Sequence, residues 1–207
     1  MDALFIKARG IKAAVIECQR KVLKEGIFIE DNGCSIKEVL QVSIMITNPS
    51  PCSSFFKAPL FNPKMLDWMQ NNFFSKRPII DWNYSYGQRL FGYNGINQVK
   101  MIIRKLRKNP SIKSAVITLT RPGFDNNHVP CLTTIDFKIR NGNLLLICSF
   151  RSQDVFKKMY ADILCLARIQ KNVADELKVG IGALFLNVAS AHIYKDDLAK
   201  ALTLVKN

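Results

Sequence analysis

Two short stretches of this sequence contain residues that could carry out nucleophilic chemistry. Cys131 follows a proline at the start of a predicted strand, and Arg151 and Ser152 follow the next predicted strand. A thiol attacks as the thiolate, and a nearby fixed cation favours that form. An arginine also presents a planar fork of donors that suits phosphate oxygens. Cys131 is therefore either a nucleophile beside an anion-binding arginine, or a core thiol beside a surface charge.

A β-hairpin is predicted to carry these residues. Its turn falls at Asn141-Gly142, a dipeptide typical of two-residue hairpin turns. Apolar and polar residues alternate along the first arm, as in a strand with one buried face. Cys131 begins the first arm and Arg151 ends the second.

The rest of the chain alternates between helical and extended patterns and contains no repeat or linker. Residues 79–95 are dense in aromatic residues, glycine and asparagine, lack a clear period, and are predicted to be a loop that lines a site. The segment 50–63 is also predicted to be a loop. The predicted helices are 2–24 (ending at Gly26), 63–74, 96–109, 153–177 and a segment after Tyr194. The remaining predicted strands are 34–49, 113–122 and 180–194.

This mixture predicts an α+β fold in which helices cover one side of a mainly antiparallel sheet. A chain of 207 residues with 48% hydrophobic residues suits one domain, 1–207. It contains no apolar run of the roughly 18–20 residues that a membrane helix needs. Lys7, Arg9 and Lys12 interrupt any signal-peptide core, so we expect a soluble cytoplasmic protein.

Cysteine and charge content narrow the class of ligand. The six cysteines form no CxxC pair and have no histidine at metal-ligand spacing, so we predict reduced thiols and no metal site. The net charge is +14, with a dense basic cluster at 100–113. Such a cluster is a solvated helix face, a nucleic-acid surface or a field that collects an anionic small molecule. No nucleic-acid-binding motif accompanies it, so the charge alone does not decide between these readings, although it fits an anionic ligand.

Four short elements in register resemble the thymidylate synthase superfamily. They are Pro130-Cys131, Arg151–Phe156 (RSQDVF), His192–Tyr194 (HIY) and residues 81–90 (DWNYSYGQRL). From Cys131 to Tyr194 their separations match the family pattern without insertion or deletion, and the similarity spans about residues 79–197. The resemblance implies a thymidylate synthase-like fold whose sheet has a back face that forms a homodimer interface.

The resemblance also implies roles at a pyrimidine nucleotide. Cys131 would be the nucleophile: its thiolate adds to C6, and C5 becomes electron-rich enough to attack a one-carbon electrophile. Arg151 and Ser152 would bind the phosphate. Tyr86 would help to order water for removal of the C5 proton. The implied one-carbon donor is 5,10-methylenetetrahydrofolate.

Further residues match functional positions of the family, and some of them also have an ordinary structural explanation. His192 and Tyr194 match the pair that binds the sugar hydroxyl; they share one strand face, although such a pair is ordinarily structural. Asp154 matches a carboxylate that contacts the pterin, but it also fits an acid at a helix N-terminus. Trp82 is a second candidate for cofactor binding. Lys113 stands at one of two positions where the family supplies arginines across the dimer to the phosphate, and a serine follows it.

Position 162 separates members of the superfamily. Thymidylate synthases have an asparagine there that pairs with uracil, whereas this chain has Asp162. A carboxyl group complements cytosine, which offers N3 as an acceptor and the N4 amino group as a donor. The resemblance is therefore to cytidylate hydroxymethylases, which imply 5-hydroxymethylation of CMP or dCMP. The alternative is an exposed helix residue.

Three features depart from the family pattern. Residues 39–100 contain no glutamate to match the catalytic one; Glu38, Asp67 and Asp81 are the nearby acids. Leu132 stands where the family often has a histidine directly after the nucleophile. The sequence also ends soon after Tyr194, without the segment that closes over folate in long members.

Three hypotheses remain open from the sequence. The first is a folate-dependent cytidylate hydroxymethyltransferase, and the second is a thymidylate synthase-like enzyme that acts on dUMP. The third is a non-catalytic nucleotide- or RNA-binding relative, which the missing glutamate and the charge of +14 favour.

Overall fold

The computed structural model describes residues 4–50, 61–79, 82–125 and 128–206. The helices are α1 (Ile11–Glu25), α2 (Pro63–Phe74), α3 (Tyr86–Gly92), α4 (Gln98–Lys108), α5 (Met159–Leu177) and α6 (Leu198–Lys206). The strands are β1 (Leu4–Ala8), β2 (Ile27–Asp31), β3 (Cys34–Ile46), β4 (Val116–Thr118), β5 (Leu132–Arg140), β6 (Asn143–Phe150), β7 (Gln153–Asp154) and β8 (Gly180–Tyr194).

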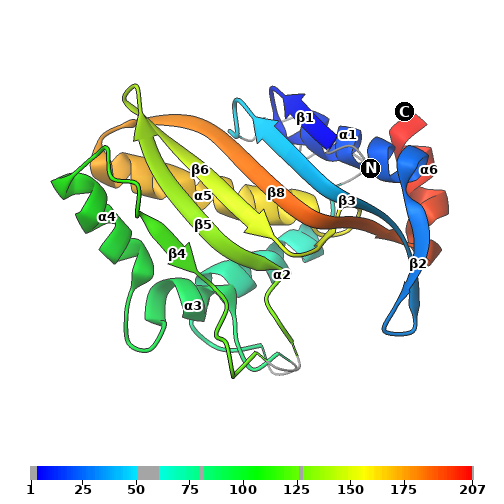
Figure 1. Ribbon diagram of the computed structural model, residues 1–207, viewed down its shortest axis with the longest axis horizontal. Helices are drawn as coiled ribbons and strands as arrows, with labels where there is room; N and C mark the ends of the chain where they lie inside the picture. Colours follow the sequence, from blue (N-terminus) through cyan, green and yellow to red (C-terminus); the bar gives the residue numbers. More distant parts are fainter. Residues whose placement is uncertain (1–3, 51–60, 80–81, 126–127, 207) are drawn as a thin grey trace.

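The strands form one mixed sheet with the order β1-β3-β8-β6-β5-β4, to which β2 adds on β3 and β7 on β8 (Figure 1). The pairs β2–β3, β3–β8, β4–β5 and β5–β6 are antiparallel, whereas β1–β3, β6–β8 and β7–β8 are parallel. The predicted α+β class with a mainly antiparallel sheet is therefore confirmed.

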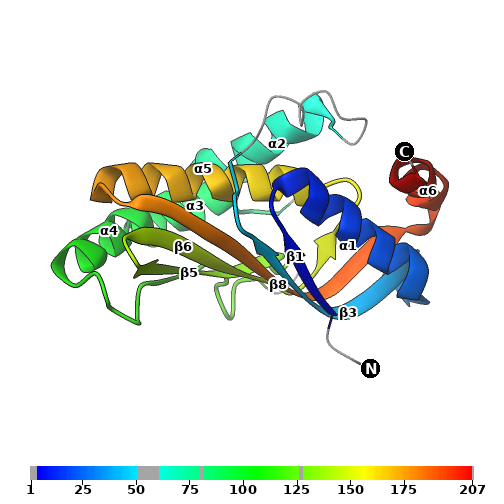
Figure 2. The same cartoon turned by 90° about the horizontal axis from the view of Figure 1, so that it is seen from above.

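Helices α1, α2 and α5 lie on one face of the sheet, and the other face is left open by them (Figure 2). α5 is the central helix: Ala161, Ile163 and Leu166 are fully buried, and Gln170 donates to the carbonyls of Leu144 and Gly182 in the sheet. The sheet face toward α5 carries the alternate apolar residues of β6 and β8, such as Leu146 and Leu184. This alternation is the period-2 pattern of a sheet with one buried face.

The predicted hairpin is confirmed. β5 pairs antiparallel with β6, and the turn residues Asn141 and Gly142 have φ angles of 50° and 72°. A second hairpin of the same kind joins β2 to β3 through Asn32 and Gly33, with φ angles of 49° and 77°. Positive φ at both turn positions favours asparagine and glycine.

The prediction of one helix over 2–24 is wrong for its first part. Residues 4–8 form β1, which pairs in parallel with β3, and α1 begins only at Ile11. Ile6 is buried while its neighbours Phe5 and Lys7 are exposed, which is a strand period. Pairing with a long neighbouring strand outweighs a weak helical spacing.

Two other boundaries also differ from the prediction. The predicted helix 153–177 begins at Met159, because Gln153 and Asp154 form β7 beside β8. The predicted loop 79–95 contains α3, whose N-cap Ser85 accepts a hydrogen bond from the backbone N–H of Gln88. Residues 80–81, and most of the predicted loop 50–63, lie outside the described residues.

The helices of the described residues include none that is both long and apolar enough to cross a membrane.

Candidate active site

A cavity of about 440 Å³ lies where β5 begins and β6, β7 and β8 end. This volume falls in the range of small-molecule sites. Its lining includes a thiol, two imidazoles, three phenols, two carboxylates and two cationic side chains. The lining residues are Asp31, Asn32, Trp82, Tyr84, Tyr86, His128, Val129, Cys131, Arg151, Ser152, Asp154, Lys158, His192 and Tyr194.

The β5–β6 hairpin brings the candidate nucleophile and the candidate phosphate ligand together. Leu132 is paired with Phe150, and beyond that pair the Arg151 N–H donates to the Cys131 carbonyl at 2.8 Å. Cys131 and Arg151 therefore lie at the same end of the hairpin, where both line the cavity. Antiparallel pairing enforces this proximity, although the two residues are separated in sequence.

Arg151, Ser152 and Cys131 form a connected polar row. The Arg151 guanidinium donates through Nε and Nη2 to the Val129 carbonyl, at 3.1 and 2.7 Å. Its Nη1 lies 3.4 Å from Ser152 Oγ, which lies 3.5 Å from Cys131 Sγ. The side chain of Arg151 is exposed but fixed by these bonds. The row provides a thiol with a hydroxyl and a permanent cation at one edge of a cavity.

Cys131 differs from the core thiols of the described residues. Cys18, Cys148 and Cys165 are buried, and burial raises the pKa of the Cys18 thiol to about 12. Cys131 is half-buried and lines the cavity. The reading of Cys131 as one more buried core thiol does not fit this position, since a thiolate needs access to its substrate.

Tyr86 lies next to the thiol and is firmly anchored. Its hydroxyl accepts a hydrogen bond from the Leu132 N–H at 3.2 Å. Its own N–H donates to Asn72 Oδ1 at 3.0 Å, and its ring packs edge-on against Phe73 with 5.0 Å between centroids. Burial raises the pKa of the Tyr86 phenol well above its usual value. The hydroxyl is thus a neutral, fixed group beside Cys131.

Asp162 lies on α5, behind the cavity wall. It is 4% exposed, so the alternative of an exposed helix residue is wrong. Its Oδ2 accepts a hydrogen bond from Gln153 Nε2 at 2.8 Å. Burial raises the pKa of the Asp162 carboxyl to about 7, against the opposing effects of Gln153 and Lys158. Asp162 does not line the cavity. Its charge raises the pKa of Tyr86, which does line the cavity.

His192 and Tyr194 line the cavity together from the end of β8. Their rings are perpendicular, with 5.3 Å between centroids. Burial lowers the pKa of the His192 imidazole, and its Nδ1 is buried without a hydrogen-bond partner among the described residues. A neutral imidazole with a free nitrogen is able to bind a ligand hydroxyl.

Asp154 belongs to β7 and not to a helix N-terminus, which corrects the helical alternative. Its Oδ1 accepts hydrogen bonds from the N–H groups of Phe156 and Lys157, at 3.1 and 2.9 Å. Its Oδ2 is buried and has no partner within the described part of the chain. Burial raises the pKa of this carboxyl. A buried acceptor that the fold leaves unpaired suits a ligand with N–H donors.

Trp82 provides an aromatic wall for the cavity. Its ring stacks on His128, with 4.6 Å between centroids, and meets Trp68 edge-on at 5.2 Å. Lys158 Nζ lies 5.8 Å from the centroids of both tryptophan rings. Burial, Arg151 and Lys158 all lower the pKa of His128. This part of the cavity combines flat rings with a cation.

Besides Asp162, Lys113 is the other predicted site residue that does not line the cavity. Its carbonyl accepts a hydrogen bond from Lys138 Nζ at 2.8 Å, near the far end of β5. Lys138 stands seven residues beyond Cys131 on β5, which is roughly 23 Å along a strand. Within one chain Lys113 therefore does not reach the thiol.

Of the acids named near the missing glutamate, Glu38 and Asp67 do not line the cavity. Glu38 pairs with His192 across β3 and β8, but its carboxylate accepts a hydrogen bond from Ser190. Asp67 lies on α2, outside the lining, and Asp81 lies outside the described residues. Asp31 and Asp154 are the carboxylates of the lining.

Several residues of the site were missed in the sequence. His128, Lys158, Tyr84 and the hairpin residues Asp31 and Asn32 also line the cavity. Both histidines of the chain, His128 and His192, line the cavity. The low histidine content of the sequence could therefore have pointed to His128 as a site residue. The Asn32-Gly33 dipeptide similarly marks the hairpin that brings Asp31 to the cavity.

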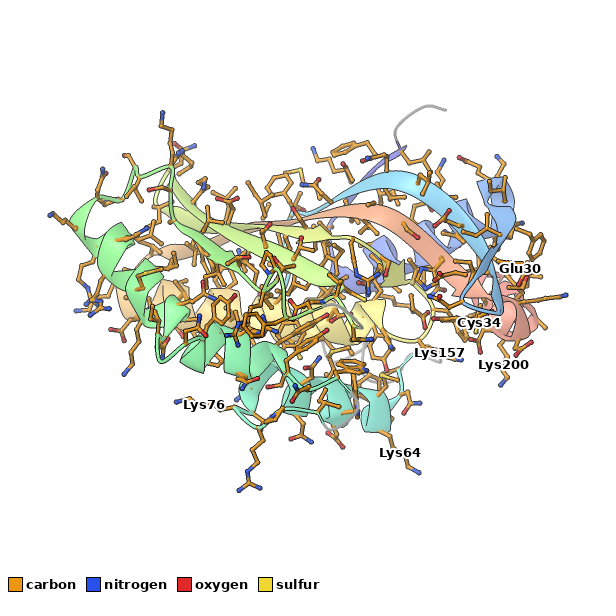
Figure 3. The ribbon with its side chains drawn as sticks, turned by 60° about the horizontal axis from the view of Figure 1, so that its bottom comes forward. Glu30, Cys34, Lys64, Lys76, Lys157 and Lys200 are labelled. Carbon is orange, nitrogen blue, oxygen red and sulfur yellow. The ribbon has the colours of Figure 1, made fainter. Side chains whose placement is uncertain are left out.

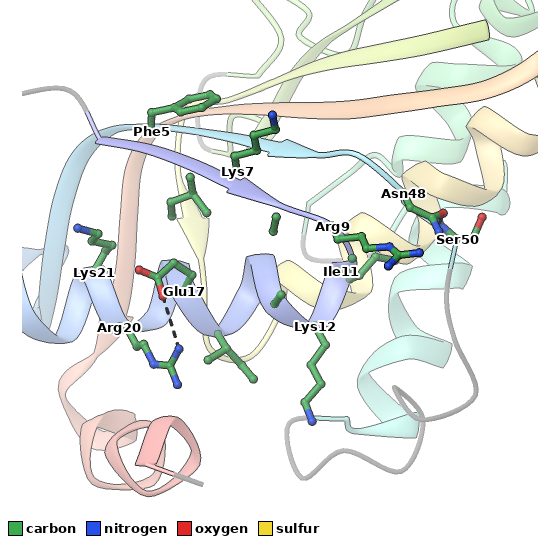
Figure 4. A pocket seen from close by; sticks show the side chains of 15 residues that line it. Phe5, Lys7, Arg9, Ile11, Lys12, Glu17, Arg20, Lys21, Asn48 and Ser50 are labelled. Carbon is green, nitrogen blue, oxygen red and sulfur yellow. Dashed lines mark hydrogen bonds and ion pairs between the residues drawn. The ribbon is translucent and has the colours of Figure 1, made fainter.

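A larger hollow of about 1070 Å³ lies between β1 and α1 (Figure 4). Its lining includes five cationic side chains beside apolar ones, and Arg20 pairs there with Glu17. Its described lining contains no cysteine, histidine or tyrosine. The smaller cavity around Cys131 gathers these groups and is therefore the candidate active site.

Comparison with known proteins identifies the family. A family model described as thymidylate synthase matches residues 58–207. A putative thymidylate synthase of Methanocaldococcus jannaschii is 31% identical over 93% of this chain and 91% of its own. A putative thymidylate synthase of Methanosarcina mazei is 29% identical over 97% of this chain and 94% of its own. A deoxyuridylate hydroxymethyltransferase of Bacillus phage SP01 is 28% identical over 88% of this chain and 56% of its own.

The match covers the strands and helices that carry Cys131, Arg151, Asp162 and His192. The protein therefore belongs to the thymidylate synthase family.

Proposed function

We propose that this protein is a folate-dependent 5-hydroxymethyltransferase that acts on CMP or dCMP. The observation that carries the proposal is the buried carboxyl of Asp162, whose pKa is raised to about 7 by burial. A carboxyl that holds its proton near neutral pH presents one donor and one acceptor. Cytosine requires this pair, because N3 accepts and the N4 amino group donates.

The thiol of Cys131 begins the proposed reaction. Its thiolate adds to C6 of the pyrimidine, and the electron pair of the C5–C6 double bond moves toward the ring's polar edge. C5 would then bond to the one-carbon unit and lose its proton, tetrahydrofolate would leave with the electron pair of the C–N bond, and water would add to the exocyclic methylene that remains. The thiolate finally leaves C6, which restores the double bond. Tyr86 and Arg151 support this sequence through the fixed hydroxyl and the cation near the sulfur.

The nucleotide's other groups find partners around the same cavity. Arg151 and Ser152 offer donors to phosphate oxygens at one edge. His192 and Tyr194 offer an imidazole and a phenol to a sugar hydroxyl. Asp31 lies on the β2–β3 hairpin, near the rings of His192 and Tyr194. Its negative charge favours placement of the phosphate toward Arg151 and away from this hairpin.

The remaining part of the cavity would hold the family's one-carbon donor, 5,10-methylenetetrahydrofolate. This donor would supply the carbon at the oxidation level of formaldehyde. The buried, unpaired Oδ2 of Asp154 would accept from N–H groups of the pterin ring. The flat face of Trp82 would stack on a ring, and Lys158 would attract a carboxylate.

The pH dependence of nucleotide binding follows from the Asp162 pKa of about 7. CMP requires the protonated carboxyl, so binding is full below this pKa and weakens as the pH rises through it. We expect the dissociation constant to rise about tenfold for each pH unit above the pKa, because the competent fraction falls in that proportion. Calorimetric titration between pH 6 and 9 measures the slope. Asp162→Asn removes the slope and controls for titration of the phosphate; an equal slope in both proteins contradicts the assignment.

We further propose a homodimer in which Lys113 reaches the partner's phosphate site. Two observations support it: the open face of the sheet (Figure 2), and the half-exposed apolar residues Met45, Ile147 and Phe185 on that face. Phe185 pairs with both of the others across β3, β8 and β6, so the three form one patch.

Sedimentation should find a dimer that Phe185→Asp converts to a monomer, because a charge then enters an apolar interface. Asn187→Asp adds the same charge two residues along the same face, at an exposed position, and should leave the dimer intact. A wild-type monomer, or equal dissociation by both variants, contradicts the interface.

A thymidylate synthase that acts on dUMP is the second candidate, and the names of the archaeal relatives favour it. Incubation with CMP, dCMP or dUMP and the folate donor separates the two reactions. The proposal predicts a 5-hydroxymethyl product from CMP or dCMP and no dihydrofolate absorbance. A methylated product from dUMP with dihydrofolate contradicts it.

A further inference from the structure

We propose that Gln153 is a positioning residue that makes Asp162 selective between cytosine and uracil, by fixing which carboxyl oxygen carries the proton. This inference rests on the proposed role of Asp162 as the residue that reads the base.

The two side chains form a buried pair contributed by different elements. Gln153 is 3% exposed on β7, where its backbone pairs with Ala191 of β8. Asp162 is 4% exposed on α5. Gln153 Nε2 donates to Asp162 Oδ2 at 2.8 Å, and within the described residues no other side chain donates to this carboxyl. Strand β7 therefore fixes the position of the Gln153 amide, and this amide fixes the orientation of the Asp162 carboxyl.

A neutral carboxyl group alone is ambiguous as a base reader. With the proton on one oxygen it complements cytosine, and with the proton on the other it complements uracil, which has N3–H and O4 in place of N3 and N4 amino. A proton moves between the two oxygens without any motion of the side chain. A protonated Asp162 without a fixed neighbour would thus accept both bases.

Gln153 removes this ambiguity. An amide N–H bonds more strongly to an unprotonated carboxyl oxygen than to a hydroxyl oxygen, because the unprotonated oxygen carries more negative charge. Oδ2 is therefore retained as the acceptor, and the proton of a neutral Asp162 lies on Oδ1. The second lone pair of Oδ2 stays available for a base amino group.

The other groups around the carboxyl act on its charge but do not distinguish its oxygens by a hydrogen bond. Lys158 favours the ionised form, and Asp154 disfavours it. The titratable groups that perturb Asp162 or are perturbed by it are Lys158 at the N-cap of α5, Cys165 on α5, Asp154 on β7, Tyr86 on α3 and Cys148 on β6. The directional contact is the one from Gln153.

The test replaces Gln153 with methionine, which keeps the length of the side chain and removes the donor. The ratio of the UMP to the CMP dissociation constant should fall about tenfold, the equivalent of one buried hydrogen bond. The pKa of the Asp162 carboxyl, followed by carbon-13 NMR, should rise above its value of about 7, because a donor to the ionised form is lost.

Gln19→Met is the matched control. Gln19 is also fully buried, and its Nε2 donates at 2.9 Å to the carbonyl of Val155, close to Gln153 in the chain. This control should lose stability without a change in base selectivity. Gln153→Glu is the second variant if the methionine protein does not fold: the two carboxyls share a proton, so the same loss of selectivity is expected.

The outcomes separate the inference from the proposed function. A tenfold loss of selectivity in the Gln153 variant and none in Gln19→Met supports the positioning role. Unchanged selectivity in the Gln153 variants, with altered selectivity in Asp162→Asn, overturns the positioning role alone. Unchanged selectivity in Asp162→Asn overturns the role of Asp162 in base reading, and the inference with it.

Discussion

Replacement of Cys131 by alanine is expected to lower turnover by about 10⁴-fold or more, because removal of a covalent nucleophile eliminates the step on which all later steps depend. The effect should be confined to the chemistry. The thiol makes one long contact, to Ser152 Oγ at 3.5 Å, so nucleotide binding and the folded state should change little. The measurement is kcat together with the dissociation constant of CMP.

The chain offers a control for this substitution in Cys34. This cysteine is exposed on the β2–β3 hairpin at the edge of the molecule, close to Glu30 (Figure 3), and does not line the cavity. Cys34→Ala should retain full turnover. If Cys131→Ala keeps more than about a hundredth of the activity, a covalent mechanism through this sulfur is wrong.

Replacement of Asp162 by asparagine is expected to produce the second large effect, a change of base preference by about a hundredfold or more toward uridylate. Two buried hydrogen bonds to the base are exchanged, and each mismatch costs about 1–3 kcal/mol. Sites that are built to hydrogen-bond one pattern reject the other strongly. The change is nearly isosteric, and the Gln153 amide can rotate so that its Oε1 accepts from the new amide N–H at position 162, which leaves the new amide oxygen for N3–H of uracil.

The measurement compares CMP with UMP, and dCMP with dUMP, in the same titration. An unchanged ratio would show that Asp162 does not contact the base. Asp175→Asn provides the control, because Asp175 lies near the end of the same helix and pairs with Lys171 on its exposed surface. It should leave the ratio unaltered.

The parts of the fold that sequence predicts well are those set by local pattern. The β5–β6 hairpin follows from alternation and from Asn141-Gly142, and β8 follows from one long apolar segment. These signals are contained within each segment, so no distant contact is needed to interpret them. The same local signal at Asn32-Gly33 marks the β2–β3 hairpin, which was overlooked.

The parts that sequence predicts poorly depend on distant partners. β1 is a strand because β3 lies beside it, and residues 153–154 are extended because β8 holds them. The same limit applies to the site. Ala161 and the lysines before it suggest an exposed Asp162, yet α5 turns this residue inward. Gln153 has no signal in the sequence at all, since its importance comes from a contact between β7 and α5.

The cavity itself combines both kinds of information. Register with the family predicts that Cys131, Arg151, His192 and Tyr194 lie together, and all four line one cavity. The electrostatic environment required the structure. Burial determines that Asp162 titrates near neutral pH and that His192 tends to be neutral, and burial is a property of the whole fold.

The most direct measurement is the release of tritium to water from C5 of labelled CMP and UMP, in the presence of the folate donor. Bond formation at C5 must expel its hydrogen, so release reports the thiolate-dependent step whatever the final product. We predict release from the cytosine nucleotide that exceeds release from the uracil nucleotide, and none with Cys131→Ala. Nucleotide binding without any release from either label would contradict catalysis, and faster release from UMP would contradict the reading of cytosine by Asp162.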